Sequence, residues 1–390
     1  MTKPTSDVDV YSDENILEPY ETYRELRDQA PAVWLDRHGV WCLSRYRDVY
    51  AALHDHETFS SAKGIALCDE VNQMLIGNSV ATDPPEHDRI RAITAPQMSN
   101  RALRNYQEMF AQKAGELVDE LCQRGTFDAV TDFAERFPSA LVPDLLGWPV
   151  DGRDHLYDWA SAVFNAIGPM NERTIAGLPA LQEMGEFTHK VSTTDGMLTE
   201  GSWGAELVAK ARAGEISDQL LPSLIIDYLA PSLDTTKSAL GSVMLLLGSH
   251  PDQWKLVRDD RGLISNAFNE VLRYEAPIRG FYRVVTKNVT YDDATIPADS
   301  RVLVLYASAN RDERFWDNAD SFDVTRKNAA GHMGFGHGVH ACLGMGLARM
   351  EANALLTALA ERVETIDIGE PTWGLNNTIR GLESLTVTVR

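Results

Sequence analysis

A glycine-punctuated run near the C-terminus brings one cysteine to the expected start of a helix. The run reads FGHGVHACLG over residues 335–344, and the cysteine is Cys342. Unpaired backbone N–H groups and the positive end of a helix dipole favour thiolate over thiol at such a position. Gly336 and Gly338 allow a tight turn that presents bare backbone to a flat ligand, and Phe335 can shield the sulfur. A shielded thiolate is the proximal ligand that a haem needs to cleave an O–O bond.

This run is similar to the signature F-G-x-G-x-[HR]-x-C-x-G of the cytochrome P450 family, and the chain resembles that family over nearly its whole length. The resemblance implies haem b as cofactor, with Cys342 as the axial ligand of the iron. It also implies a mainly α fold with a small β portion, in which the haem lies between a long distal helix and the cysteine loop. The plainer alternative is that Cys342 is a small buried hydrophobic residue, the commonest fate of a free cysteine.

Four residues match the positions at which the family holds the two haem propionates. His87 and Arg91 resemble its HxxxR motif and lie four residues apart on one helix face, and Arg283 and His340 match the other two positions. Arginine suits carboxylates because its guanidinium donates two parallel hydrogen bonds. Taken singly, each of these residues could equally be an ordinary surface charge.

Glu270 and Arg273 lie three residues apart, and are therefore neighbours on one face of a predicted helix. In solvent such a pair contributes only a few tenths of a kcal/mol, on the order of 0.3. The family has a buried Glu–Arg pair at this place before the cysteine, completed by a residue from a later meander. By that resemblance Arg326 completes the set, and its role is to hold the thiolate loop.

A long predicted helix carries an acid beside a hydroxyl, Asp234-Thr235. Oxygen activation needs two protons delivered without flooding the site, which such a pair can do. Alternatively, Thr235 simply bonds back to a carbonyl of its own helix. The pair matches the family motif [AG]-G-x-[DE]-T, but Pro231 and Ser232 depart from it. Because Pro231 cannot donate to the carbonyl of Asp227, we expect a locally opened helix built in by covalent geometry.

Three stretches, 163–169, 276–283 and 377–384, resemble the bacterial subfamily that oxidises para-substituted benzoates, notably by O-demethylation. The resemblance implies an aromatic-sized pocket, although any single apolar residue more often belongs to the core. The residues implied to line it are Phe164, Ile167, Ile278 and Phe281.

The carboxylate-binding arginine and serines of that subfamily do not carry over. By alignment, this chain has Met74, Gly77, Asp227 and Ala230 in their places. An unpaired buried Asp227 would repel a benzoate and is costly in itself. We therefore expect a neutral phenolic or methoxylated aromatic, or one bearing an amine. In the alternative, Asp227 turns away and belongs to a proton or solvent path.

These features predict a monooxygenase that inserts one oxygen of O2 into a small aromatic substrate by hydroxylation or O-demethylation. Two alternatives are a natural-product tailoring enzyme acting on a larger scaffold and a non-catalytic haem-binding or sensing protein, although a sensor needs no Asp234-Thr235 pair. We expect one haem domain over residues 1–390, without a fused reductase. Electrons would then come from a separate ferredoxin and an NAD(P)H-dependent ferredoxin reductase. Candidate basic contacts for an acidic ferredoxin are Arg101, Arg104, Lys113 and Arg349.

Composition narrows the remaining classes. The 390 residues carry a net charge of −21, which argues against nucleic-acid and anionic-membrane partners. Four cysteines without zinc spacing indicate a reducing compartment. The polar N-terminus has no apolar run of signal or membrane length, which predicts a cytoplasmic protein of the bacterial type and, by default, a monomer.

Hydrophobic periodicity predicts the elements that position these residues. Residues 60–83 look irregular. Predicted helices are 20–29, 49–53, one opened by Pro84-Pro85, 103–123, 133–146, 153–167, 177–193, 205–213, 217–248, 252–258, 264–274 and one from the cysteine loop to about 361. Predicted strands are 32–35, 40–43, 282–289, 301–306 and 384–389. Many helices with a few segregated strands give a mainly α class.

Overall fold

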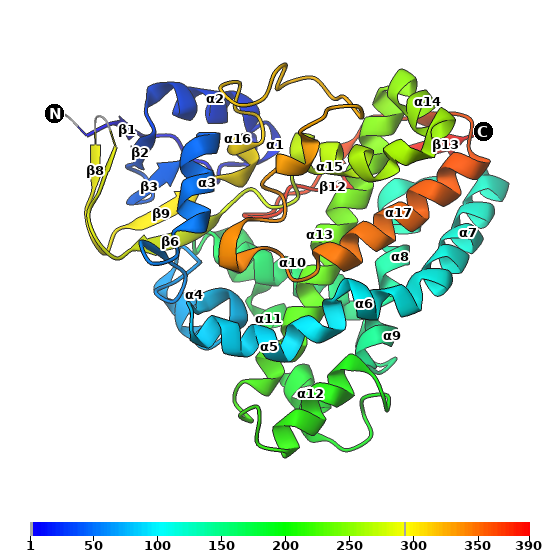
Figure 1. Cartoon of the computed structure of the whole chain (residues 1–390), viewed down its shortest axis with the longest axis horizontal. Coiled ribbons are helices and arrows are strands. Elements are labelled where there is room, and N and C mark those ends of the chain that lie inside the picture. The colour runs from blue at the N-terminus through cyan, green and yellow to red at the C-terminus, as the bar shows by residue number, and fades with distance from the viewer. Residues whose placement is uncertain (1–2, 292–293) are drawn as a thin grey trace.

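The computed structural model describes residues 3–291 and 294–390, and most of them are helical (Figure 1). The mainly α class with a small β portion is confirmed. The helices are α1 (Asp13–Leu17), α2 (Tyr20–Gln29), α3 (Tyr46–His54), α4 (Asp69–Met74), α5 (Glu86–Met98), α6 (Asn100–Leu103), α7 (Gln107–Arg124), α8 (Arg136–Ser139), α9 (Val142–Leu146), α10 (Leu156–Ile167), α11 (Glu172–Thr193), α12 (Trp203–Arg212), α13 (Leu221–Ser249), α14 (Pro251–Asp259), α15 (Ile264–Tyr274), α16 (Tyr306–Ala309) and α17 (Met345–Arg362).

The strands form one larger sheet and three small ones. The larger sheet has the order β1-β2-β3-β9-β6-β4, and its β2–β3 hairpin pairs Ala32 with Leu43. The strands are β1 (Thr5–Ser6), β2 (Ala32–Leu35), β3 (Val40–Leu43), β4 (Phe59–Ser60), β5 (Thr126–Asp128), β6 (Phe281–Val285), β7 (Val289–Tyr291), β8 (Ala294–Ile296), β9 (Arg301–Val304), β10 (Ile366–Ile368), β11 (Thr372–Trp373), β12 (Leu382–Ser384) and β13 (Thr386–Val389).

Helix α13 is the longest element and runs through the middle of the molecule, with α17 beside it (Figure 1). Its sequence is apolar on most sides, as expected of a helix surrounded by other elements. Its C-terminal half, from Ser238 to Leu247, is buried residue after residue. The helix therefore forms the axis on which the main hydrophobic cluster is assembled.

One predicted helix, 133–146, is interrupted in the structure. A π-helical turn, Ala129–Ala134, comes first, and α8 and α9 follow as separate short helices. Pro138 and Pro143 lack the backbone N–H that a continuous helix would need, which explains the breaks. The segment 60–83, expected to be irregular, contains α4 and a 3-10 turn at Ser79–Ala81.

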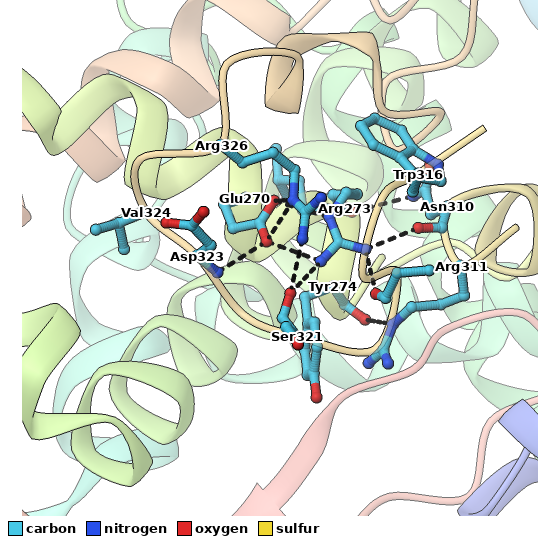
Figure 2. Close-up of polar contacts among 12 residues, drawn as sticks. Glu270, Arg273, Tyr274, Asn310, Arg311, Trp316, Ser321, Asp323, Val324 and Arg326 are labelled. Carbon is cyan, nitrogen blue, oxygen red and sulfur yellow. Dashed lines mark hydrogen bonds and ion pairs between the residues drawn. The ribbon is translucent and has the colours of Figure 1, made fainter. Parts of the chain in front are cut away.

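A buried carboxylate on α15 binds two guanidinium groups (Figure 2). Glu270 and Arg273 are fully buried, with Glu270 Oε2 at 2.7 Å from Arg273 Nε and Oε1 at 2.7 Å from Nη2. Arg326 Nε lies 3.1 Å from both carboxylate oxygens. The backbone N–H of Asp323 adds a further donor at 3.0 Å. The carboxylate is thus saturated with donors, as a buried charge requires.

The two arginines extend this cluster into the segment that follows α16. Arg273 donates to the carbonyls of Asn310 and Ala319, and both arginines donate to the carbonyl of Ser321. The Asn310 side chain in turn accepts from the backbone N–H of Met333 at 2.6 Å. The cluster therefore connects α15, through Asn310, to the chain that enters the cysteine loop.

We predict that Glu270→Gln lowers the free energy of unfolding by about 3–5 kcal/mol, because two buried guanidinium groups lose their counter-charge. The matched control is Glu361→Gln, which breaks the exposed Arg261–Glu361 pair and should cost less than about 1 kcal/mol. Urea unfolding followed by circular dichroism measures both. Equal midpoints for the two variants would contradict a stabilising role for the cluster.

His332 lies just before the cysteine loop and gives stability a pH dependence. Burial lowers its pKa from 6.5 to about 3, with Arg349, His337 and Arg273 acting in the same direction. Between these pH values the unfolded chain binds one more proton than the folded protein, so stability falls as pH drops below 6.5.

We predict that His332→Asn reduces the slope of unfolding free energy against pH by about 1.4 kcal/mol per pH unit between pH 6 and about 4. The exposed His189, changed to Asn, serves as the control. Chemical unfolding across this pH range provides the measurement. An unchanged slope in His332→Asn would show that the imidazole is not held neutral in the folded protein.

Candidate active site

The loop that delivers Cys342 is closed by its own backbone. Cys342 N–H donates to the carbonyl of Phe335 at 2.8 Å, and a 3-10 turn spans Gly338–His340 between them. Gly336 and Gly338 both have positive φ, at 62° and 70°. A Cβ at Gly338 would also clash with the Leu53 carbonyl. Glycine at position 338 is therefore required both by conformation and by the close approach of α3.

The Cys342 side chain keeps accessible surface although it lies deep within the protein. Burial raises the pKa of the Cys342 thiol, whereas the N–H groups of Gly344 and Met345 and the guanidiniums of Arg91 and Arg349 act to lower it. The expected helix-start donors are thus in place, but the protein alone favours the thiol because burial outweighs them. A bound metal ion reverses such a balance, since a coordinating thiol is deprotonated.

Three of the four residues predicted at the propionates lie beside this loop with buried nitrogens that lack a partner, although His87 Nδ1 is 3.0 Å from Asp88 Oδ1. His87 Nε2, Arg91 Nε and both ring nitrogens of His340 are buried and have no hydrogen-bond partner among residues 3–291 and 294–390. The two imidazole rings are 4.6 Å apart, and Arg91 Nη2 donates to the carbonyl of Ala341 at 3.1 Å. His340 Nε2 is 3.8 Å from Asp83.

The fourth residue, Arg283 on β6, is buried and donates to the carbonyl of Tyr282 at 2.7 Å. Burial lowers the pKa of His340 to about 4; Asp83 opposes this shift, while the charge of Arg283 adds to it. Arg283 is therefore close to the imidazole, and all four residues gather in one place. Buried donors without acceptors are costly, so the site fits a ligand that brings acceptors, as the two carboxylates of haem b do.

Phe335 lies half-buried on the other side of the loop. The Arg349 guanidinium lies 5.3 Å from the centre of its ring and donates to Asn269 Oδ1 at 3.2 Å. Of the other basic residues considered for an electron donor, Arg101 and Arg104 are exposed, and Lys113 donates to the carbonyl of Ala140.

On α13, the acid and the hydroxyl of the predicted pair have different partners. Asp234 is buried, and its Oδ1 lies 2.8 Å from Lys237 Nζ. Thr235 Oγ1 donates to the carbonyl of Pro231 at 2.6 Å. Lys237 is also 3.7 Å from Glu135 and lies over the ring of Tyr157.

Sequence reasoning missed Lys237 and Glu135. The i,i+3 spacing from Asp234 could have indicated Lys237. Nothing local pointed to Glu135, which is brought to α13 by the segment that follows the π-helical turn.

The long helix is not broken at Pro231, contrary to the expectation of a local opening there. α13 is continuous from Leu221 to Ser249, with Pro231 inside it and exposed. A proline removes only one N–H donor, and packing around the rest of the helix is sufficient to keep it helical. The Thr235 hydroxyl, one turn after Pro231, donates a hydrogen bond to the Pro231 carbonyl. This back-bond is the plainer of the two roles considered for Thr235.

The expectation that Asp227 is an unpaired buried charge is wrong. Its Oδ1 accepts from Asn78 Nδ2 at 2.9 Å and its Oδ2 from Ser79 Oγ at 2.6 Å. Burial raises the pKa of Asp227, and these two hydrogen bonds oppose that shift. The sequence missed both partners because it indicated no structure for their segment. Ala230, one turn later, is buried.

The four residues predicted to line the substrate pocket lie in adjoining apolar clusters. Phe164 and Ile278 belong to one cluster and Ile167 to another, and the half-buried Phe281 packs against both. Phe281 thus joins the two clusters that contain the other three residues. In contrast, Met74 is 73% exposed and Gly77 lies in a turn with φ of 83°.

Across the described ranges, none of the helices has the length and apolar character needed to span a membrane.

The chain is similar to known proteins in sequence and in fold. The family model described as Cytochrome P450 matches residues 202–366. Cytochrome p450 CYP199A2 of Rhodopseudomonas palustris is 36% identical over 98% of this chain and 94% of its own length. The beta-dihydromenaquinone-9 omega-hydroxylase of Mycobacterium tuberculosis is 32% identical over 98% of this chain and 78% of its own length.

Solved structures match over almost the whole chain. Mycobacterium marinum cytochrome P450 CYP268A2 in complex with pseudoionone has a TM-score of 0.89 at 22% identity, covering 99% of both chains, and is similar in fold. Cytochrome P450 CREJ in complex with (4-ethylphenyl) dihydrogen phosphate has a TM-score of 0.85 at 28% identity, covering 96% of this chain and 98% of its own. This chain belongs to the cytochrome P450 family, whose members use haem b, and it is a P450 monooxygenase.

Proposed function

We propose that this P450 inserts one oxygen atom of O2 into a small aromatic substrate, by hydroxylation or O-demethylation. The overall change is RH + O2 + 2e⁻ + 2H⁺ → ROH + H2O, and at a methoxy carbon the product is a hemiacetal that releases formaldehyde. The observation that carries the proposal is the placement of the accessible Cys342 thiol among unsatisfied buried donors, in a protein whose central helix bears Asp234-Thr235.

The proximal residues hold the cofactor. Bound haem supplies the iron at which dioxygen is bound and cleaved. Cys342 would supply the thiolate ligand of the haem iron, and Phe335 with Gly336 shapes the loop around the sulfur. The Glu270 cluster keeps that loop in place. The four donors for the propionates are His87, Arg91, Arg283 and His340.

The distal residues manage protons. Thr235 can donate or accept through its hydroxyl, and Asp234 is the acid that replenishes it. In the structure Lys237 binds Asp234, while Thr235 bonds Pro231. Proton delivery therefore requires that the Thr235 hydroxyl leave the Pro231 carbonyl and that Asp234 turn from Lys237 toward it.

Two observations support an aromatic substrate. Phe164, Ile167, Ile278 and Phe281 supply apolar surface of the kind that an aryl ring contacts. In addition, the similar CREJ protein was solved with an arylphosphate. A second candidate is tailoring of a larger scaffold, which is favoured by the likeness to a hydroxylase named for a menaquinone.

We propose electron supply by a separate ferredoxin and its NAD(P)H-dependent reductase. Arg101 on α6, which packs against α17, and the nearby Arg104 are both exposed. They offer positive charge to an acidic partner in spite of the net charge of −21. The same proposal takes residues 1–390 as one haem domain acting as a cytoplasmic monomer.

Oxidation of 4-methoxy and 4-hydroxy aromatics in ¹⁸O2, with ferredoxin and reductase supplied, tests the reaction. We predict that Thr235→Ala lowers the share of electrons recovered in product about tenfold or more and raises peroxide correspondingly. Ser249→Ala is the matched control, because Ser249 makes the same helical back-bond on α13, to Leu245. Equal product coupling in Thr235→Ala and Ser249→Ala would contradict the distal role of Thr235.

We also predict that Arg91→Ala speeds haem loss about tenfold or more, since a charge-assisted hydrogen bond is worth about 1.5–3 kcal/mol. Arg89→Ala on the same helix is the control, because Arg89 pairs with Glu86 in solvent. Transfer of haem to an excess of apomyoglobin follows the rate. Indistinguishable rates for the two variants would rule out Arg91 as a propionate partner.

A further inference from the structure

We propose that Asp227 selects aromatic substrates that present a hydrogen-bond donor and rejects carboxylates, which names the substrate class and rests on the proposed monooxygenase function. The donor is a cationic or neutral N–H or O–H group on the end of the ring remote from the site of oxidation. The proposal follows from where Asp227 lies, from what its oxygens already accept and from the charges around it.

Asp227 lies on the same side of α13 as the distal residues. Asp227, Pro231 and Thr235 follow one another at intervals of four, which places them along one face of the helix. Pro231 is exposed and the other two are half-buried, so protein side chains cover this face only in part. The neighbouring positions on the remaining faces, Tyr228, Leu229, Ala230 and Leu233, are buried.

The carboxylate of Asp227 is anchored but not saturated. The side chains of Asn78 and Ser79 each donate one hydrogen bond, one to each oxygen, and the backbone N–H of Ser79 is a third donor. An ionised carboxylate has about four acceptor positions and no donor. The remaining positions can accept an N–H or O–H of a ligand. A ligand carboxylate offers only acceptors and a second negative charge, and both are unfavourable in a site of low dielectric.

The nearby polar groups do not reverse this preference. Arg91 is a cation close enough to lower the pKa of Asp227, but its Nη2 is bound to the carbonyl of Ala341 on the proximal side. The hydroxyl of Tyr228 donates to the carbonyl of Thr94. Among the described residues no cation forms an ion pair with Asp227 within 4 Å, so a ligand that approaches the free lone pairs of this carboxylate meets acceptor oxygens first.

The two donors also tie a surface segment to α13. Met74 and Ile76 are 73% and 68% exposed, and Gly77 adopts a left-handed turn before Asn78. Asn78 Oδ1 accepts from Val80 N–H, so the anchoring side chain also shapes the turn that follows it. Mutation can separate the attachment of this segment from the charge, because Asn78 and Ser79 donate the attaching hydrogen bonds and Asp227 carries the charge.

The test is equilibrium binding to the ferric holoenzyme of three ligands of the same shape, 4-methoxybenzamidinium, 4-methoxybenzamide and 4-methoxybenzoate. Calorimetry gives the affinity and the haem spectrum gives the spin-state shift. We expect the amidinium to bind about tenfold or more tightly than the benzoate, because the amidinium can donate a charge-assisted hydrogen bond to Asp227 and the benzoate cannot. Asp227→Ser removes the charge, keeps a hydroxyl and should reduce that ratio about tenfold.

The double variant Asn78→Ala/Ser79→Ala is the matched control for the tie. Hydrogen exchange in residues 78–82 should increase, whereas the preference for the amidinium should remain. If Asp227→Ser does not fold, Asp227→Asn removes the charge at nearly constant size and must show the same loss of preference.

Equal affinity of the wild-type enzyme for benzoate and amidinium, or an unchanged ratio in both Asp227 variants, would overturn the proposal. These results are independent of turnover. Failure of the proposed function would appear instead as the absence of both ¹⁸O-labelled hydroxylation product and released formaldehyde, even where ligand selectivity is as expected.

Discussion

The buried carboxylate of Glu270 binds the guanidinium groups of Arg273 and Arg326. Much of the proximal half of the protein depends on this arrangement. Neither arginine could remain there without the negative charge, and the carboxylate could not remain without them. Their outer N–H groups bind carbonyls of residues 310–321, and Asn310 continues the chain of contacts to Met333. A loop of glycines that has little rigidity of its own thereby acquires a fixed origin at Met333, nine residues before Cys342.

Two carboxylates of α13, those of Asp227 and Asp234, show how the partners of a side chain determine its chemistry. Asp234 pairs with Lys237, which also lies close to a second acid, Glu135. This arrangement can hold the Asp234 side chain and release it for proton delivery. Asp227 accepts hydrogen bonds from the neutral side chains of Asn78 and Ser79, with Arg91 as the nearby cation, and has acceptor capacity to spare. The same residue type thus serves two positions of one helix differently. The difference comes from Lys237 on the same helix and from Asn78, Ser79 and Glu135, which are distant in the sequence.

Local patterns were sufficient where structure is locally determined. Helices α2 and α15 and the β2–β3 hairpin have the predicted limits because their apolar spacing and turn residues lie within the segments themselves. The cysteine loop could equally be predicted from its glycine spacing. Contacts between distant segments were not: the partners of Asp227, the Glu135–Lys237 contact and the dominance of burial in the pKa of Cys342 all depend on packing. Pro231 was misjudged because packing preserves a helix that proline alone would weaken.

The central claim is that the Cys342 sulfur, delivered by its loop, is the thiolate ligand of a haem. The most direct measurement is the absorption spectrum of the reduced protein with carbon monoxide, recorded for the wild type and for Cys342→Ala. The account predicts the red-shifted Soret band of thiolate ligation in the wild type and its loss in the variant. A wild-type spectrum without that band, or a variant that retains it, would contradict the assignment of Cys342.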